Sequence, residues 1–203
     1  ADAAVVAKRL PMAEMFAPAV RRQTLLLTAM TGLNFFAYQA FTGWATTYLK
    51  DVRQLPPDLI GQVLGVQFIA AALGGFGWGV LSDQLGRRAA AWGFVAAAAL
   101  IPVYLFVPLG NGAFLAVGFG YGMMLSASAV WGPWLSELYP PHLRSTAASI
   151  FNWGRIVSML APIITGALVP YLGMAPVMLM GSAAFLLAAA IWRALPETLG
   201  QTI

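Results

Sequence analysis

The sequence contains little of what most metal sites and enzyme active sites are built from. Of its 203 residues none is cysteine and only His142 is histidine, so zinc sites, iron–sulfur sites and a cysteine nucleophile have no ligands to use. Charged residues make up 9% of the chain, against about 25% in an ordinary soluble domain. Hydrophobic residues make up 60%, and a soluble fold this apolar would expose patches that drive aggregation. The composition therefore predicts an integral membrane protein.

The charge-free runs predict how often the chain crosses the bilayer. A hydrocarbon core of about 30 Å takes about 20 apolar residues in a helix. The 48 residues from Ala89 to Ser136 carry no charge. As one helix they would measure roughly 72 Å, so the chain must turn back, and Gly110-Asn111-Gly112 has the turn chemistry. We expect an all-α bundle of six transmembrane helices, at about 23–49, 59–82, 89–109, 113–137, 145–169 and 173–193.

Lysine and arginine are distributed unevenly between the two ends of these expected helices. Lys50 and Arg53 lie at one end, and eight lie at the other: Lys8, Arg9, Arg21, Arg22, Arg87, Arg88, Arg144 and Arg193. Cytoplasmic loops carry the excess of positive charge. We therefore expect a multi-pass protein of the inner or plasma membrane with both termini in the cytoplasm. The net charge of +4 follows from this bias and does not indicate nucleic-acid binding.

The two ends of the chain are expected to lie outside the bundle. Residues 1–22 are interpreted as a cytoplasmic lead-in, or equally as the end of a linker between two halves of a larger protein. Residues 194–203 are interpreted as a cytoplasmic tail.

A motif follows the second expected span. The residues Gly79-Val80-Leu81-Ser82-Asp83-Gln84-Leu85-Gly86-Arg87-Arg88 resemble the G-x-L-x-D-x-x-G-R-R/K signature of major facilitator superfamily transporters. Gly79 would allow close helix approach and Gly86 a tight turn. Asp83 would either cap the start of a helix or pair with the nearby guanidinium groups and so hold one state of a cytoplasmic gate. The alternative is a basic inner-face loop with an incidental acid.

A second motif lies at the inner end of the fourth expected span. The stretch from Gly132 to Pro140, followed by Arg144, resembles the E-x-x-P-x-x-x-R pattern after the tenth helix in sugar-porter-like and organic-acid-symporter branches of the same superfamily. A weaker match is Pro196-Glu197-Thr198 after the last span. The resemblance implies that Glu137 and Arg144 join Asp83, Arg87 and Arg88 in a cytoplasmic charge cluster. Pro133 is expected to bend its span as a gate hinge.

By position, these motifs assign the six spans to helices seven to twelve of a twelve-helix transporter. The resemblance therefore implies a partner, namely an amino-terminal six-helix half in the same polypeptide or in a second chain. The lipid bilayer is the other expected partner.

Arg155 is the most informative single residue. It lies ten residues into the fifth expected span, roughly 15 Å and about mid-bilayer, where an arginine costs about 2.5–3.5 kcal/mol on insertion scales. Asn152 lies one turn earlier on the same helix face. The run Asn152-Trp153-Gly154-Arg155, followed by Pro162, looks like that of aromatic-acid and monocarboxylate proton symporters. Arg155 is thus expected to bind substrate or to take part in proton coupling, unless it is a structural arginine satisfied by backbone carbonyls or by a carboxylate of the other half.

Other polar side chains also fall within the expected spans, and interhelical packing is the alternative for each of them. The expected substrate-binding residues besides Arg155 and Asn152 are Asn34, Tyr38, Gln39, Gln67 and Tyr121. Because no embedded carboxylate pair, histidine cluster or serine–base arrangement is present, no catalytic residue is expected and the chain is not interpreted as an enzyme.

These observations predict half of a secondary active transporter that moves a small organic anion by alternating access. Protons are the expected coupling ion, and no metal or other cofactor is expected. Two alternatives stay open. One is a sugar or polyol transporter, although Thr28 and Ala29 stand where sugar porters carry a glutamine pair. The other is a self-associating six-helix membrane protein.

Overall fold

The computed structural model describes residues 11–200, which form six long helical segments and contain no strand. A short helix, α1 (Pro11–Glu14), precedes them. The segments are α2 (Arg21–Thr47) with the π-helical η1 (Tyr48–Val52); α3 (Pro57–Leu85); η2 (Arg87–Ala90) with α4 (Ala91–Phe106); α5 (Asn111–Leu125), η3 (Ser126–Val130) and α6 (Trp131–Leu138); η4 (Pro141–Leu143), α7 (Arg144–Ala148) and α8 (Ile150–Leu172); and α9 (Met174–Ala194).

Five of these segments are long and apolar enough to cross a membrane: Pro57–Leu85, Arg87–Phe106, Asn111–Leu138, Pro141–Leu172 and Met174–Ala194. The sixth, α2, has 27 residues and would measure about 40 Å. It is long enough to cross but less apolar than the other five, and several of its residues are polar, among them Thr24, Thr31 and Asn34. Its crossing of the membrane stays a prediction.

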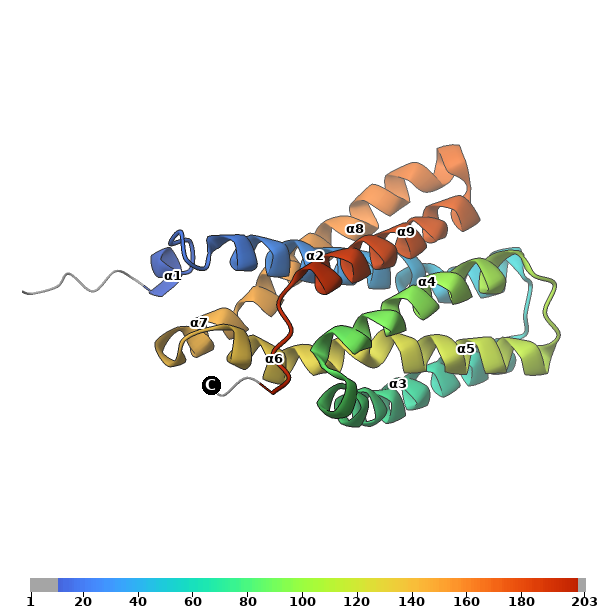
Figure 1. The fold of residues 1–203 in the computed structure, drawn as a ribbon. Helices are drawn as coiled ribbons and strands as arrows, with labels where there is room; N and C mark the ends of the chain where they lie inside the picture. Colours follow the sequence, from blue (N-terminus) through green and yellow to red (C-terminus); the bar gives the residue numbers. More distant parts are fainter. Residues whose placement is uncertain (1–10, 201–203) are drawn as a thin grey trace, which may run out of the picture.

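The helices pack side by side into one bundle (Figure 1). α3 lies against α5, α5 against α4, α4 against α9, α9 against α2, and α2 against α8. The helix α2, which is not among those five segments, is thus held between α8 and α9. A cluster of buried aromatic rings fills one end of the core. The ring centre of Trp192 in α9 lies 5.2 Å from that of Trp131 and 5.8 Å from that of Trp134, both in α6.

Most of the described basic residues lie at one end of the bundle, which we call the basic end. It carries α1, the turn into η2, α6, α7 and the last turn of α9 (Figure 1). Arg21, Arg87, Arg144 and Arg193 belong to these elements, whereas Lys50 and Arg53 follow the other end of α2. Lys8 and Arg9 lie outside the described residues.

The fourth segment departs from α-helix upstream of the predicted hinge. The departure is the 3₁₀ stretch Ser126–Val130, where the Ser126 hydroxyl donates to the Met123 carbonyl at 2.7 Å. Pro133 instead lies in the first turn of α6, where backbone N–H groups have no partner within the helix, so that the absence of an N–H on proline breaks no helical hydrogen bond. The irregular stretch therefore lies before Pro133, and Ser128 within it lines a pocket together with residues of α2, as described below.

Candidate functional site

A groove between α2 and α8 brings together four of the seven residues expected to bind substrate. Its volume is about 540 Å³. Tyr38 and Gln39 line it from α2, and Asn152 and Arg155 line it from α8. The remaining lining residues are Phe35, Ile156, Ser158 and Met159. We call this space the Arg155 groove.

Close contact between the two helices positions Arg155 in this groove. A Cβ atom on Gly154 would lie 2.8 Å from the backbone of Thr31, so glycine is needed where α8 meets α2. The next residue, Arg155, then places its guanidinium carbon 5.7 Å from the centre of the Phe35 ring. Arg155 lies near the middle of the helical stretch Pro141–Leu172, and Phe35 lies near the middle of α2. The cation therefore sits at mid-height of the bundle.

The guanidinium of Arg155 has no carboxylate within salt-bridge distance among residues 11–200. The α8 face around it is apolar and turned away from the bundle, with Ile156 62% and Ile163 68% exposed. A polar cation on such a face is available to a ligand or to a second protein surface.

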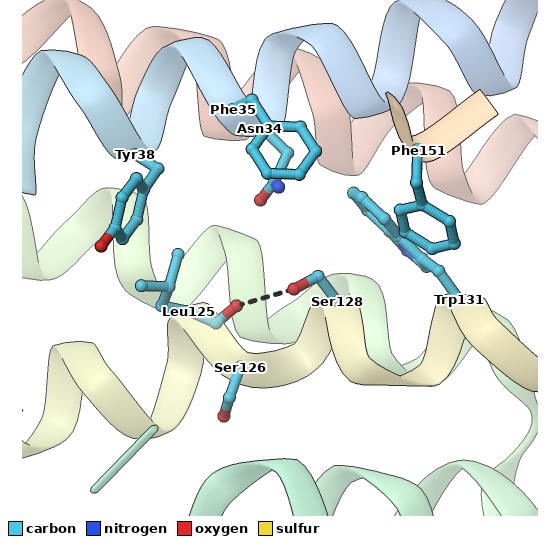
Figure 2. A pocket seen from close by; sticks show the side chains of 8 residues that line it. All are labelled: Asn34, Phe35, Tyr38, Leu125, Ser126, Ser128, Trp131 and Phe151. Atoms are coloured by element: carbon cyan, nitrogen blue, oxygen red, sulfur yellow. Dashed lines mark hydrogen bonds between the residues drawn. The ribbon is translucent and has the colours of Figure 1, made fainter. Parts of the chain in front are cut away.

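A smaller pocket of about 210 Å³ adjoins the groove, because Phe35 and Tyr38 line both (Figure 2). Asn34 lines it from α2, and its amide points into the space. Ser128 and Trp131 line the opposite side, from η3 and the start of α6. The other lining residues are Leu125, Ser126 and Phe151. We call this space the Asn34 pocket.

The structure places the last two expected binding residues elsewhere. Tyr121 is 1% exposed inside the bundle, where its hydroxyl lies 3.2 Å from that of Thr42 and its ring lies 4.7 Å from that of Phe41. Gln67 is equally buried, at the contact of α3 with Gly122 of α5. Neither lines the Arg155 groove or the Asn34 pocket, and both occupy helix-packing positions.

Apart from Tyr38, sequence reasoning missed the aromatic and serine residues that line these two spaces. Phe35 borders both, and a ring one residue from Asn34 and three from Tyr38 is a weak signal in a chain so rich in aromatics. Ser128 lines the Asn34 pocket from the 3₁₀ stretch Ser126–Val130, and no residue of that run predicts a departure from α-helix.

At the basic end, Arg87 forms the centre of a charge cluster. Its Nη2 donates to Glu137 Oε1 at 2.6 Å and its Nε to Glu137 Oε2 at 3.2 Å, a two-point pairing between η2 and α6. Its Nη1 donates to Asp83 at 2.5 Å and to the Ser82 hydroxyl at 2.9 Å. Arg87 therefore ties the end of α3 to the end of α6.

Glu197 completes this cluster from the tail. Its carboxylate accepts the backbone N–H groups of Arg87 at 2.8 Å and Arg88 at 2.9 Å, while the Arg88 Nε donates to the Leu195 carbonyl at 2.6 Å. Burial would raise the pKa of the Glu197 carboxyl, but backbone donors, including those of Thr198 and Leu199, outweigh it and hold that pKa below its usual value. The neighbouring Thr198 hydroxyl donates to Glu137.

The motif residues differ in how the structure uses them. Gly86 has φ +97°, and a Cβ atom there would lie 2.6 Å from Glu197 Oε2, so the position needs glycine. A Cβ atom on Gly79 would meet nothing within 4 Å, so this glycine mediates no close approach among the described residues. Arg144 also stays outside the cluster, and its Nε donates to the Tyr139 carbonyl at 3.3 Å.

The arrangement offers binding chemistry: one cation, several hydrogen-bonding groups and aromatic walls at mid-height of an apolar bundle. Among residues 11–200 there is no group of three or more histidine, cysteine, aspartate or glutamate side chains that could hold a metal ion. Five helical segments long and apolar enough to cross a membrane, beside a groove that holds a cation, define the class of multi-pass membrane proteins.

The comparison with known families agrees with this class. A model of the Major Facilitator Superfamily matches residues 24–202, which is most of the chain, and the chain belongs to that superfamily. This confirms the resemblance drawn from the motifs and the expected helical membrane fold. It also confirms that the chain is a transporter component and not an enzyme.

Three similar proteins carry the name organic anion transporter 3. Those of Rattus norvegicus and Mus musculus are each 41% identical over 88 residues, covering 40% of this chain and 16% of the relative. That of Pongo abelii is 31% identical over 195 residues, covering 90% of this chain and 34% of the relative. The chain thus spans about a third of the length of the orangutan protein.

Proposed function

We propose that this chain is one six-helix half of a secondary active transporter that moves a small organic anion, and that Arg155 binds the anion's carboxylate. The observation that carries this proposal is the position of Arg155, a cation at mid-height of the bundle on an outward face, lining a groove of about 540 Å³. The guanidinium fork can pair with both oxygens of a carboxylate.

Lipid is an unfavourable partner for the face of α8 that carries Arg155. An arginine against lipid at mid-bilayer costs about 2.5–3.5 kcal/mol on insertion scales, and none of the carboxylates among the described residues offsets that cost. A water-filled cavity or another protein surface removes it. The apolar neighbours Ile156, Met159 and Ile163 favour a second helical bundle that covers most of the face and leaves the groove open between the two.

The names of the similar proteins support an anionic substrate. Each is called an organic anion transporter, and a cation in the groove suits an anion better than a sugar or polyol. We further propose that protons are coupled to transport. Since the Arg155 groove has no aspartate or glutamate in its lining, the titrating carboxylate would come from the second bundle.

The second bundle would be an amino-terminal six-helix half, in the same polypeptide or in a second chain. Alternating access would then rock the two bundles against one another, with the Arg87 cluster holding the basic end together in one state. By the bias of basic residues, the basic end and both termini would face the cytoplasm of a cell whose inner or plasma membrane holds the protein.

An uptake assay with a ligand panel tests the proposal. The transporter, in the form in which it occurs in cells, is reconstituted in liposomes and offered benzoate, lactate, glucose and sorbitol with and without an inward proton gradient. Uptake of an acid, stimulated by the gradient and inhibited by other acids, is expected. Uptake of glucose or sorbitol with no effect of acids would overturn the anion assignment.

A further inference from the structure

A groove along α2 is separate from the two spaces described above. Its volume is about 640 Å³, and none of the residues that line it is charged. Six of these seven residues belong to α2, between Leu25 and Phe36, and the seventh is Val157 of α8. The one hydroxyl among them, that of Thr28, already donates to the Thr24 carbonyl at 2.9 Å. The groove therefore suits an apolar occupant, and we call it the Leu25 groove.

The Leu25 groove lies on the other side of the α2–α8 contact from the Arg155 groove. Phe35 lines the Arg155 groove and Phe36 lines the Leu25 groove, a turn of about 100° around the axis of α2. On α8, Arg155 and Val157 are two residues apart and so face nearly opposite directions. Leu25 is 53% and Val157 38% exposed, so the groove is open to whatever surrounds the bundle. Because it is turned away from the Arg155 face, on which we place the second bundle, its surroundings in a membrane are lipid.

Two arginines lie at the end of this groove that belongs to the basic end. Arg22, Leu25, Ala29 and Phe36 follow one another at spacings of three, four and seven residues, which keep them on one face of α2. Arg21 and Arg22 are both exposed, and neither forms a salt bridge among residues 11–200. From Leu25 to Phe36 the helix rises about 16 Å, and half of a hydrocarbon core of about 30 Å is about 15 Å. The groove below Arg22 thus has the depth of one membrane leaflet.

A polar pocket adjoins Arg22. It has a volume of about 170 Å³ and lies between the start of α2 and the end of α9. Arg22 and Gln23 line it from α2, and Leu195 lines it from the chain that follows α9. Arg88 approaches the same stretch of chain, because its Nε donates to the Leu195 carbonyl at 2.6 Å. An arginine pairs with two oxygens of a phosphate as it does with those of a carboxylate, so this pocket suits a phosphate group.

We propose that this pocket and the Leu25 groove together bind one anionic phospholipid of the cytoplasmic leaflet, with the phosphate on Arg22 and an acyl chain in the groove. A phospholipid carries an anion and an apolar chain on one molecule, as the two adjoining spaces require. Anionic lipids of the cytoplasmic leaflet attract basic residues near its surface. A helix of another bundle would fill the groove but leave Arg22 without an anion, so it matches less well. The inference rests on the proposed crossing of α2 and does not involve the substrate at Arg155.

Native mass spectrometry of the purified transporter, in the form in which it occurs in cells, measures the affinity of the first bound lipid. The probes are phosphatidylglycerol, which is anionic, and phosphatidylcholine, which is zwitterionic, with identical acyl chains. Arg22→Ala removes the charge and Arg22→Lys keeps it. Arg193→Ala is the matched control, because Arg193 lies at the same end of the bundle but lines neither space, and its guanidinium carbon lies 5.2 Å from the centre of the Trp92 ring.

A second pair of variants tests the acyl chain. Ala29→Phe places a ring in the Leu25 groove, and Ala190→Phe adds the same ring at an exposed alanine of α9 that does not line the groove. Ala29→Phe should weaken the binding of both lipids, by about fourfold for each CH₂ group that it displaces from the groove. It should leave the ratio of the two affinities unchanged, and Ala190→Phe should change neither affinity.

We expect the unmodified protein to bind phosphatidylglycerol at least about fivefold more tightly than phosphatidylcholine, since one basic residue near an anionic headgroup contributes about that factor. Arg22→Ala should lower this ratio by about fivefold, whereas Arg22→Lys and Arg193→Ala should leave it within about twofold of its original value.

Equal affinity for the two lipids in the unmodified protein would overturn the inference. Equal losses in Arg22→Ala and Arg193→Ala would overturn it as well, because the basic end would then attract anionic lipids without a defined site. Undiminished binding of both lipids by Ala29→Phe, together with a lower thermal stability of that variant, would show that a protein helix fills the groove instead. If Ala29→Phe fails to fold, the arginine variants decide.

Discussion

Replacing Arg155 by alanine separates a binding arginine from a structural one. Its guanidinium has no carboxylate partner among residues 11–200 and contacts the Phe35 ring, an interaction worth about 0.5–1 kcal/mol at accessible sites. The free energy of unfolding should therefore fall by less than about 1 kcal/mol. A charge-assisted hydrogen bond to a ligand carboxylate is worth about 1.5–3 kcal/mol, so affinity for an organic acid should fall roughly 10- to 150-fold.

Arg53 provides the matched control, because it is a structural arginine of the same chain. Its Nη2 donates to the carbonyls of Leu105 and Val107, both at 2.9 Å, and so caps the end of α4. Arg53→Ala should reduce the free energy of unfolding by about 2 kcal/mol and leave affinity unchanged. Arg155→Lys keeps the charge but loses the planar fork, and its affinity should lie between the two extremes.

The assay is calorimetric titration with benzoate together with thermal unfolding in detergent, for all three variants. If Arg155→Ala unfolded much more easily yet bound benzoate with normal affinity, Arg155 would be structural and the proposed site would be wrong. Such a result would mean that a carboxylate of another bundle satisfies the charge.

Three further outcomes are expected. Cysteines introduced as Gln84→Cys and Asn111→Cys should react with impermeant reagents from opposite sides of the membrane, and same-side labelling would contradict the six-span topology. Glu137→Gln should destabilise the basic end more than Asp83→Asn, measured by thermal unfolding, because Glu137 pairs with Arg87 at two points while the Asp83 side chain is 66% exposed. The stability contributed by Glu197 should be complete above about pH 5 and lost as the pH falls below about 4, because the folded-state pKa of this carboxyl is lowered. Glu197→Gln should therefore weaken the loss of unfolding free energy at acid pH. An unchanged acid dependence in this variant would show that Glu197 does not contribute.

The residues of the Arg155 groove illustrate how far the sequence reaches. Arg155 and Asn152 could be named in advance because a charge and an amide three residues apart in an apolar run share one helix face. Tyr38 and Gln39 could be named because they are polar in a run expected to cross the membrane. The same criterion also selected Tyr121 and Gln67, which pack inside the bundle, because polarity in a span does not say which face of the helix carries the residue.

The Arg87 cluster shows a similar limit. The signature spacing identified Asp83, Gly86 and Arg87, and the structure brings the first and last within 2.5 Å. It did not distinguish Glu137, which pairs with Arg87, from Arg144, which turns to the Tyr139 carbonyl. Nor did it show that Gly79 faces open space, since the partner of a helix face is set by how the helices cross.

By itself the sequence indicated that the helices lie in a membrane, and it indicated the fold class and the family. Long charge-free runs exclude water as their surroundings, and the spacing of the loop motif identifies the superfamily. Only the tertiary structure decided which polar residues share a space. The contact of Gly154 with Thr31 and the 3₁₀ break at Ser126–Val130 are products of helix packing. They bring Arg155 and Phe35 together and place Ser128 at the Asn34 pocket, across more than 90 residues of chain, a distance over which local sequence patterns carry no information.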